Sequence, residues 1–327
     1  MIQHTLEKAE NILIITHVDP DGDAIGSLTA IGLALRQIEQ RFTLVCDDNV
    51  PERFRYLPTA DKVRKSPDWL DSYDLLIAVD CGDEFRMGKA FSSLPGPKPF
   101  IINIDHHVTN TQFGDINLVD PKATSTSEIL YRLFADLNIA ISEEIALSLL
   151  TGLVTDTLGF RTVGVTANTL RIAADLIDAG ADLGYVTMHA LNSRTMSTLE
   201  LWRTGMNKMR LEEGLLWTSI TNLERKAANF RSNSSVGLVN LLADVGEASM
   251  GAVLMEMNDG SVKVGLRCRP PYDVADVAMA LGGGGHPLAA GCSMVGPLEE
   301  AEALLVRSCQ DAIVRQSSLV VDMEMGD

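Results

Sequence analysis

The chain has 327 residues and a net charge of −17 at pH 7, and 46% of its residues are hydrophobic. This length suits two domains better than a single core, and the composition is that of a globular protein. A protein that contacts many phosphates along a duplex normally presents a broad basic surface, so the acidic composition argues against long duplex nucleic acid as a partner.

The first half of the sequence predicts a doubly wound α/β domain with a mostly parallel sheet. A buried strand over Asn11–Thr16 leads into a polar loop, His17–Asp23, and then into an amphipathic helix over Ala24–Ile38. Short apolar runs of the same kind predict further strands over Phe42–Cys46, Leu75–Asp80 and Phe100–Asp105. Helical or turn segments separate these runs, as a parallel sheet requires.

A helical region then closes this first domain, which we predict to cover residues 1–190. Its helices are expected over Ser125–Leu137, Ser142–Asp156, Thr166–Ala179 and Leu183–Ala190. The polar stretch that follows is compatible with a helix and carries no Gly-Pro loop. We therefore predict a connecting helix within 191–213 and a smaller α/β domain over 214–327.

The second domain is expected to begin with a strand and to end with a helix. Strands are predicted over Leu215–Thr221, Met250–Met257 and Val262–Cys268, and helices over Val274–Leu281 and Leu298–Gln316. Between the two helices lies the glycine run Gly282–Gly285. Such a run exposes backbone N–H groups that can bind an anion, although a glycine run alone is more often a flexible joint.

Targeting signals are not visible in the sequence. The apolar runs hold about six residues, whereas a helix needs ~20 to span a bilayer. The segment Met1–Glu10 lacks the pattern of a secretion signal. The five cysteines are widely spread and never in CxxC spacing, which argues against a disulfide framework and a thiolate zinc site. We expect a cytoplasmic protein with no membrane partner.

Histidine and aspartate residues follow the predicted parallel strands at the points where the strands end. These clusters are His17-x3-Asp21-Gly22-Asp23, Asp80 and Asp105-His106-His107, and a further aspartate, Asp156, ends a long apolar helix. The carboxyl edge of an open α/β sheet is where ligands bind. Taken singly, each aspartate is more often a helix cap or a turn residue. Several carboxylates at one edge, however, would repel one another unless cations lay between them.

The types of side chain in these clusters indicate which cations they would hold. Carboxylates and imidazoles without thiolates suit Mn²⁺ or Mg²⁺ better than structural zinc, with Co²⁺ or Fe²⁺ as substitutes. The number of such groups is enough for two ions. Two ions about 3.5–4 Å apart can orient an in-line attack on phosphorus and stabilise the attacking and leaving oxygens. The sequence therefore favours phosphoester hydrolysis.

These motifs resemble those of a known superfamily. His17-Val-Asp-Pro-Asp21-Gly-Asp23, Val-Asp80, Asp105-His106-His107 and Thr-Asp156-Thr are similar to the four ordered motifs of the DHH, or RecJ-like, phosphoesterases. The segment from Gly282 to Gly291 resembles the glycine-rich signature of the associated C-terminal domain. Together the motifs cover nearly the whole chain, and its length is most similar to the branch of nanoRNases and pAp phosphatases.

The resemblance implies a role for each of these residues. One metal ion would be held by His17, Asp21 and Asp80, and the other by Asp23, Asp80, His106 and Asp156. Asp80 would thus bridge both ions. His107 would stabilise charge, protonate the leaving oxygen or orient its neighbours, and Asp105 would orient the histidines. In the second domain, phosphate would be bound by Arg267, Gly283, Gly284, Gly285 and His286.

The same resemblance implies a metal-dependent phosphoesterase with Mn²⁺ as its cofactor and short RNA oligomers, dinucleotides or 3′-phosphoadenosine 5′-phosphate (pAp) as substrates. The alternatives are a phosphodiesterase for linear or cyclic dinucleotides, a manganese inorganic pyrophosphatase and a non-catalytic nucleotide sensor. An oxidoreductase is disfavoured because no Gly-x-Gly-x-x-Gly follows the first strand. The sequence leaves open whether the chain forms a homodimer.

Overall fold

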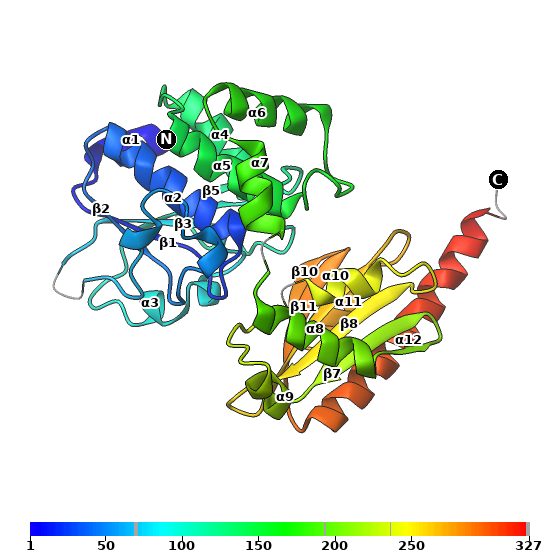
Figure 1. Ribbon diagram of the computed structural model, residues 1–327. Coiled ribbons are helices and arrows are strands. Elements are labelled where there is room, and N and C mark those ends of the chain that lie inside the picture. Colours follow the sequence, from blue (N-terminus) through cyan, green and yellow to red (C-terminus); the bar gives the residue numbers. More distant parts are fainter. Residues whose placement is uncertain (69–70, 193, 236, 325–327) are drawn as a thin grey trace. The chain divides into compact units, whose positions relative to one another are not determined.

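Four hydrophobic clusters surround two separate β-sheets in the computed structural model of the chain. The structure describes residues 1–68, 71–192, 194–235 and 237–324, with side chains as far as 318. It divides into two units, Met1–Ser193 and Arg194–Asp327, each of which is described by itself (Figure 1).

The sheet of the first unit has the strand order β2-β1-β3-β4-β5, and every neighbouring pair is parallel. The strands are β1 (Ile12–Ile15), β2 (Phe42–Val45), β3 (Leu75–Val79), β4 (Phe100–Asp105) and β5 (Ile116–Val119). The order reverses at β1, which has β2 on one side and β3 on the other. Such a reversal leaves a crevice at the carboxyl ends of β1 and β3, because the chain leaves these two strands in opposite directions.

Helices cover both faces of this sheet, as Figure 1 shows. One face carries α1 (Ile2–Lys8), α2 (Gly22–Gln37), α4 (Thr126–Asp136), α5 (Glu143–Asp156) and α6 (Ala167–Asp178). The short helix α3 (Gly88–Ser92) packs on the other face through Ala90 and Phe91. The strands are buried on both sides because their residues alternate between these two cores. The predicted doubly wound α/β fold is confirmed.

Shorter elements complete the first unit. They are the 3₁₀ turns η1 (Glu52–Phe54), η2 (Ala60–Lys62) and η3 (Glu84–Met87), the helix α7 (Leu183–Val186) and the π-helical turn η4 (Thr187–Asn192). The sequence predicted one helix over the last two. Strand β5 was not predicted, because it is a four-residue edge strand whose side chains are only partly buried.

The sheet of the second unit is mixed and has the order β10-β11-β9-β8-β7-β6. Only β7 and β8 run parallel; the other neighbouring pairs are antiparallel. The strands are β6 (Arg210–Glu212), β7 (Leu215–Ile220), β8 (Met250–Glu256), β9 (Ser261–Cys268), β10 (Gly284–His286) and β11 (Ala289–Val295). The smaller α/β domain that we predicted therefore has three strands more than expected.

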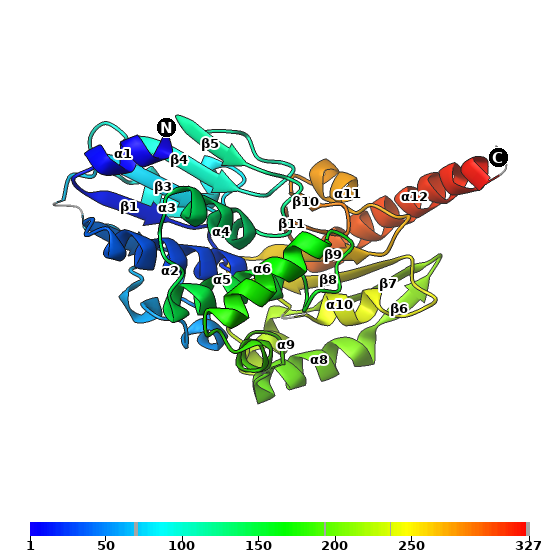
Figure 2. The same cartoon turned by 90° about the horizontal axis from the view of Figure 1, so that it is seen from above.

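Two layers of helices enclose this second sheet (Figure 2). One face packs against α8 (Met196–Lys208) and α10 (Leu238–Ala243), with α9 (Asn222–Ala227) nearby, and the other against α11 (Ala275–Ala280) and α12 (Leu298–Glu324). The segment predicted as a connecting helix contains α8, which packs on β7 within the second unit: a Cβ on Gly205 would touch Leu238 and Thr218. No described helix is both long and apolar enough to cross a bilayer.

Candidate metal centre

The loop after β1 carries the first two candidate ligands, His17 and Asp21. Asp21 caps α2, because its Oδ1 accepts hydrogen bonds from the N–H groups of Asp23 and Ala24, each at 3.0 Å. The cap fixes where the helix begins, at Gly22, the residue after Asp21. His17 Nε2 lies 4.0 Å from Asp21 Oδ1. The side chain of Asp21 therefore both caps α2 and lies where it could bind a metal ion.

Asp80, directly after β3, lies at the centre of the candidate site. Its backbone is left-handed, with φ 60°, a conformation that costs energy for a residue other than glycine. Its Oδ2 faces His17 Nε2 at 3.4 Å, and its Oδ1 faces His106 Nε2 at 3.7 Å. Oδ1 also accepts a hydrogen bond from the Thr126 hydroxyl at 2.8 Å. The two oxygens of one carboxylate therefore face different histidines.

Asp23, on the first turn of α2, is held by the N-terminus of α4. The Thr126 N–H donates to its Oδ2 at 2.6 Å. Its Oδ1 accepts from the N–H of Ser127 at 3.0 Å and from the Ser127 hydroxyl at 2.6 Å. The positive end of a helix favours a carboxylate at this place. A Cβ on Gly152 of α5 would overlap both the Ser127 hydroxyl and Asp23, so the absence of a side chain there makes room for this arrangement.

His106 and Asp156 complete the side of the site that faces Asp23. His106 Nε2 lies 3.1 Å from Asp156 Oδ2 and 4.0 Å from Asp23 Oδ2. Its other ring nitrogen, Nδ1, lies 3.4 Å from the carbonyl of Ala123. Asp156 is the last residue of α5, so it reaches the site from a helix and not from a strand end.

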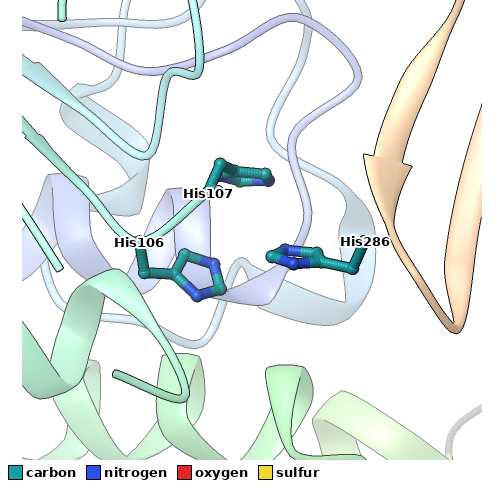
Figure 3. A group of neighbouring side chains, drawn as sticks. All are labelled: His106, His107 and His286. Atoms are coloured by element: carbon teal, nitrogen blue, oxygen red, sulfur yellow. The ribbon is translucent and has the colours of Figure 1, made fainter. Parts of the chain in front are cut away.

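His107 lies beside His106 but has different partners. Figure 3 shows the two rings near each other. Their centroids are 4.8 Å apart and their planes are inclined at 62°. His107 Nδ1 lies 2.7 Å from Asp105 Oδ1. The amide of Asn110 donates to Asp105 Oδ2 at 2.5 Å and to the carbonyl of Cys81 at 3.0 Å. Asp105 is buried, whereas the His107 side chain is 26% exposed. Asp105 thus orients a histidine that solvent can reach.

The crowding of carboxylates shifts their pKa values. Burial raises the pKa of Asp156 to about 6; the hydrogen bond and charge of His106 act to lower it, and the charges of Asp21 and Asp80 add smaller rises. The pKa of Asp23 is raised well above its usual range by burial and then by the charges of Asp80 and Asp156. Burial also acts to raise the pKa of Asp80, but the hydrogen bond from His17 and the neighbouring imidazoles lower it overall. The site therefore holds more negative charge than its histidines balance.

Divalent cations fit this donor set. The first unit contains three groups of potential metal ligands, and within each group the ligand atoms lie within 4.8 Å of one another. The groups are His17, Asp21 and Asp80; Asp23, His106 and Asp156; and Asp80, Asp105 and His107. All the donors are carboxylate oxygens or imidazole nitrogens, the ligands of Mn²⁺ and related ions. Cations between the carboxylates would remove the repulsion that raises their pKa values. The structure brings together all eight residues that the sequence singled out in the first domain.

The predicted substrate residues of the second unit lie around β10. His286 pairs with Ala289 of β11, and Ala289 pairs with Arg267 of β9. Residues directly opposite one another on neighbouring strands project from the same face, so His286 and Arg267 flank Ala289 on one side of the sheet. Two strand spacings separate them by about 10 Å. Arg267 and His286 each make other contacts as well.

The glycine run differs from the predicted loop. Gly282, with φ 79°, ends α11, and the N–H of Gly283 donates to the carbonyl of Ala278 at 2.8 Å. The expectation that Gly283 offers a free N–H to an anion is therefore wrong. Gly284 and Gly285 belong to β10, and a Cβ on Gly285 would come within 2.6 Å of the Ala289 carbonyl. Close approach of two strands explains this glycine.

Several residues of the site were missed by the sequence analysis. Thr126 and Ser127 bind candidate ligands from the start of α4, and Asn110 binds Asp105. Arg86, on η3, approaches His17 Nδ1 with its Nη2 at 3.2 Å. The pattern Ser125-x-x-Glu128 is a helix-start signal and was available in the sequence. No sequence pattern indicated the contact of Arg86.

Comparisons with known proteins match both parts of the chain to known domain families. Residues 11–153 match the N-terminal domain of the DHH family, and residues 225–313 match the DHHA1 domain. The chain is 32% identical over 322 residues to the bifunctional oligoribonuclease and PAP phosphatase NrnA of Thermus thermophilus, which covers 98% of this chain and 95% of that protein. It is 26% identical over 323 residues to the protein of the same name from Bacillus subtilis, with 92% and 94% covered.

A solved structure shows the same fold. An exopolyphosphatase-related protein from Bacteroides fragilis superposes with a TM-score of 0.86 at 24% identity, covering 97% of this chain and 96% of that one. At this identity the likeness concerns the fold alone.

Proposed function

The chain belongs to the DHH family of phosphoesterases, and on this basis we propose that it is a metal-dependent enzyme that hydrolyses short oligoribonucleotides and pAp. The observation that carries the proposal is the position of Asp80. One carboxylate at the carboxyl edge of a parallel sheet faces His17 with one oxygen and His106 with the other. A shared ligand of this kind is what a two-metal phosphoesterase requires.

In this proposal two Mn²⁺ ions occupy the site, with Mg²⁺ or Co²⁺ as substitutes. One would be held by His17, Asp21 and Asp80, and the other by Asp23, His106, Asp156 and Asp80. When bound, the ions supply positive charge to the phosphate oxygens and make a nearby water more acidic. Asp23 suits its role because Oδ2 accepts one hydrogen bond from the chain whereas Oδ1 accepts three, which leaves Oδ2 with a free lone pair.

His107 would hold the proton that the leaving oxygen needs. Burial by itself lowers the pKa of His107, but its hydrogen bond to Asp105 and the charge of Asp80 raise it overall. The bond at Nδ1 fixes the ring, so Nε2 is the atom left to donate. Asp105 contributes by orienting this ring.

The second unit would bind the substrate through Arg267, Gly284, Gly285 and His286. A guanidinium forms a planar fork that matches phosphate oxygens. His286 and Arg267, on one face of the sheet, suit a substrate with a phosphate and a second polar group. Because the rest of the chain is acidic, long nucleic acid gains few further contacts, so short substrates are favoured. The five cysteines are free and buried, which fits our proposal that the enzyme acts in the cytoplasm.

The experiment that tests this function compares four substrates with Mn²⁺: pAp, a linear dinucleotide, a cyclic dinucleotide and pyrophosphate. We expect turnover of pAp and of the linear dinucleotide. The matched control is Asp80→Asn, which keeps the size of the side chain but removes the shared charge, and which should hydrolyse neither. Rapid hydrolysis of pyrophosphate alone would contradict the proposal.

A further inference from the structure

Arg86 lies at the rim of the candidate metal centre and has no role in the mechanism above. Its backbone is fastened on both sides: its N–H donates to Asp83 Oδ1 at 3.0 Å, and its carbonyl accepts from the N–H of Val18 at 2.8 Å. The first bond caps η3, and the second ties η3 to the loop that carries His17. The side chain is exposed, and its Nη2 lies 3.2 Å from His17 Nδ1. The backbone of Arg86 is thus fixed beside His17.

The charge of Arg86 is not neutralised by a partner. Within the described part of the chain its guanidinium forms no ion pair with a carboxylate, although Asp21 and Asp80 lie around the same histidine. Arg36, Arg41 and Arg132 of the same unit all form such pairs. An arginine beside an acidic site that keeps its donors free is available to an anion.

The contact with His17 is itself incompatible with metal binding. His17 Nδ1 lies 2.7 Å from the Val18 carbonyl as well as 3.2 Å from Arg86 Nη2. A ring nitrogen cannot donate to the carbonyl and accept from the guanidinium at once. A histidine that binds a metal through Nε2 carries its proton on Nδ1 and donates it to the carbonyl. With its proton on Nδ1, His17 offers Arg86 no acceptor, so the guanidinium can donate to another group.

We propose that Arg86 binds a phosphate oxygen of the substrate, one that does not face the metal ions. The inference rests on the proposed function and adds to it a phosphate contact from the first unit. The guanidinium lies on the Nδ1 side of His17 and the metal would lie on the Nε2 side, so the two contact different oxygens. The planar fork of arginine suits this contact better than the point charge of lysine.

The test measures steady-state kinetics on pAp and on a linear dinucleotide, together with Mn²⁺ affinity by calorimetry. For Arg86→Ala we expect KM to rise about 10- to 100-fold, as for the loss of one charged hydrogen bond, with kcat and Mn²⁺ affinity within about threefold of wild type. Arg86→Lys should recover part of the loss. Arg171→Ala, which removes an exposed charge from α6, is the matched control and should leave KM unchanged.

Two results would overturn the inference. An unchanged KM in Arg86→Ala would show that no phosphate is bound there. A fall in kcat together with a fall in Mn²⁺ affinity would show that Arg86 only positions His17.

Binding of pAp is also measured with Mn²⁺ in the His107→Ala background, with and without Arg86→Ala. If wild type hydrolyses neither substrate, the proposed function fails, whereas weaker pAp binding after removal of Arg86 still supports the inference.

Discussion

Thr126 connects two of the candidate metal ligands: its N–H donates to Asp23 at 2.6 Å, and its hydroxyl donates to Asp80 at 2.8 Å. One residue at the start of α4 thus sets the positions of two carboxylates that come from different strand ends. Both bonds come from the chain itself, so the protein's own residues hold the two like charges in place. The start of the helix also supplies a favourable potential for both.

The first prediction concerns this hydroxyl. In Thr126→Ala the backbone bond to Asp23 remains, but Asp80 Oδ1 loses the hydrogen bond from the hydroxyl and is oriented less firmly. We expect Mn²⁺ affinity to fall about 10- to 100-fold, as is usual when a group that orients a ligand is removed. Calorimetric titration with Mn²⁺ measures the effect. Thr126→Ser keeps the hydroxyl and serves as the control; equal affinities of the two variants would refute the role of the hydrogen bond.

The second prediction concerns Asp156 and pH. Its folded pKa of about 6 lies above the unfolded value of 3.8. The metal-free fold therefore favours the protonated carboxyl: this contribution to stability is fully present below about pH 4 and is lost as pH rises through 6. At pH 8 the ionised group costs the metal-free protein about 1–3 kcal/mol. Asp156→Asn should then be more stable than wild type in EDTA at pH 8, but not at pH 4.

Urea denaturation at both pH values, in EDTA and in Mn²⁺, measures this difference. In Mn²⁺ the order should reverse at pH 8, because only wild type gains the free energy of ligand binding. A stability difference that stays the same at pH 4 and pH 8 in EDTA would contradict the assignment of the shifted pKa to Asp156.

The third prediction concerns the contact between α2 and α5. Gly152→Ala would push its Cβ into the Ser127 hydroxyl and Asp23. We expect a loss of about 1–3 kcal/mol in the free energy of unfolding from overpacking, and weaker Mn²⁺ binding because Asp23 must move. Gly246→Ala is the control, since nothing lies within 4 Å of the added Cβ and its φ is not positive. If Gly152→Ala had the same free energy of unfolding as wild type, α5 would be able to shift and accommodate the added Cβ without destabilising the fold.

The ligands that follow β1, β3 and β4 could be predicted because the carboxyl ends of parallel strands meet at one edge. Periodicity gave those strands and most of the helices within a few residues. Thr126 could not be predicted, since it contacts a residue 103 positions away through a helix whose direction depends on the packed core. The structural roles of the glycine run could not be predicted for a similar reason. Gly283 caps α11 and Gly285 allows β10 to approach β11, and neither requirement can be seen without the folded chain.

The last prediction separates two adjacent histidines. His106 Nε2 faces Asp156, Asp23 and Asp80, whereas His107 is held by Asp105 and is partly exposed. His106→Ala should therefore lose most of its Mn²⁺ affinity, and with it turnover. His107→Ala should keep Mn²⁺ affinity within a few-fold of wild type but lower kcat by about 10²–10⁴, as for removal of a general acid. Metal analysis and kinetics on pAp measure both quantities. If His107→Ala also lost its metal, His107 would have to be counted among the ligands, and the proton for the leaving oxygen would have to come from another group.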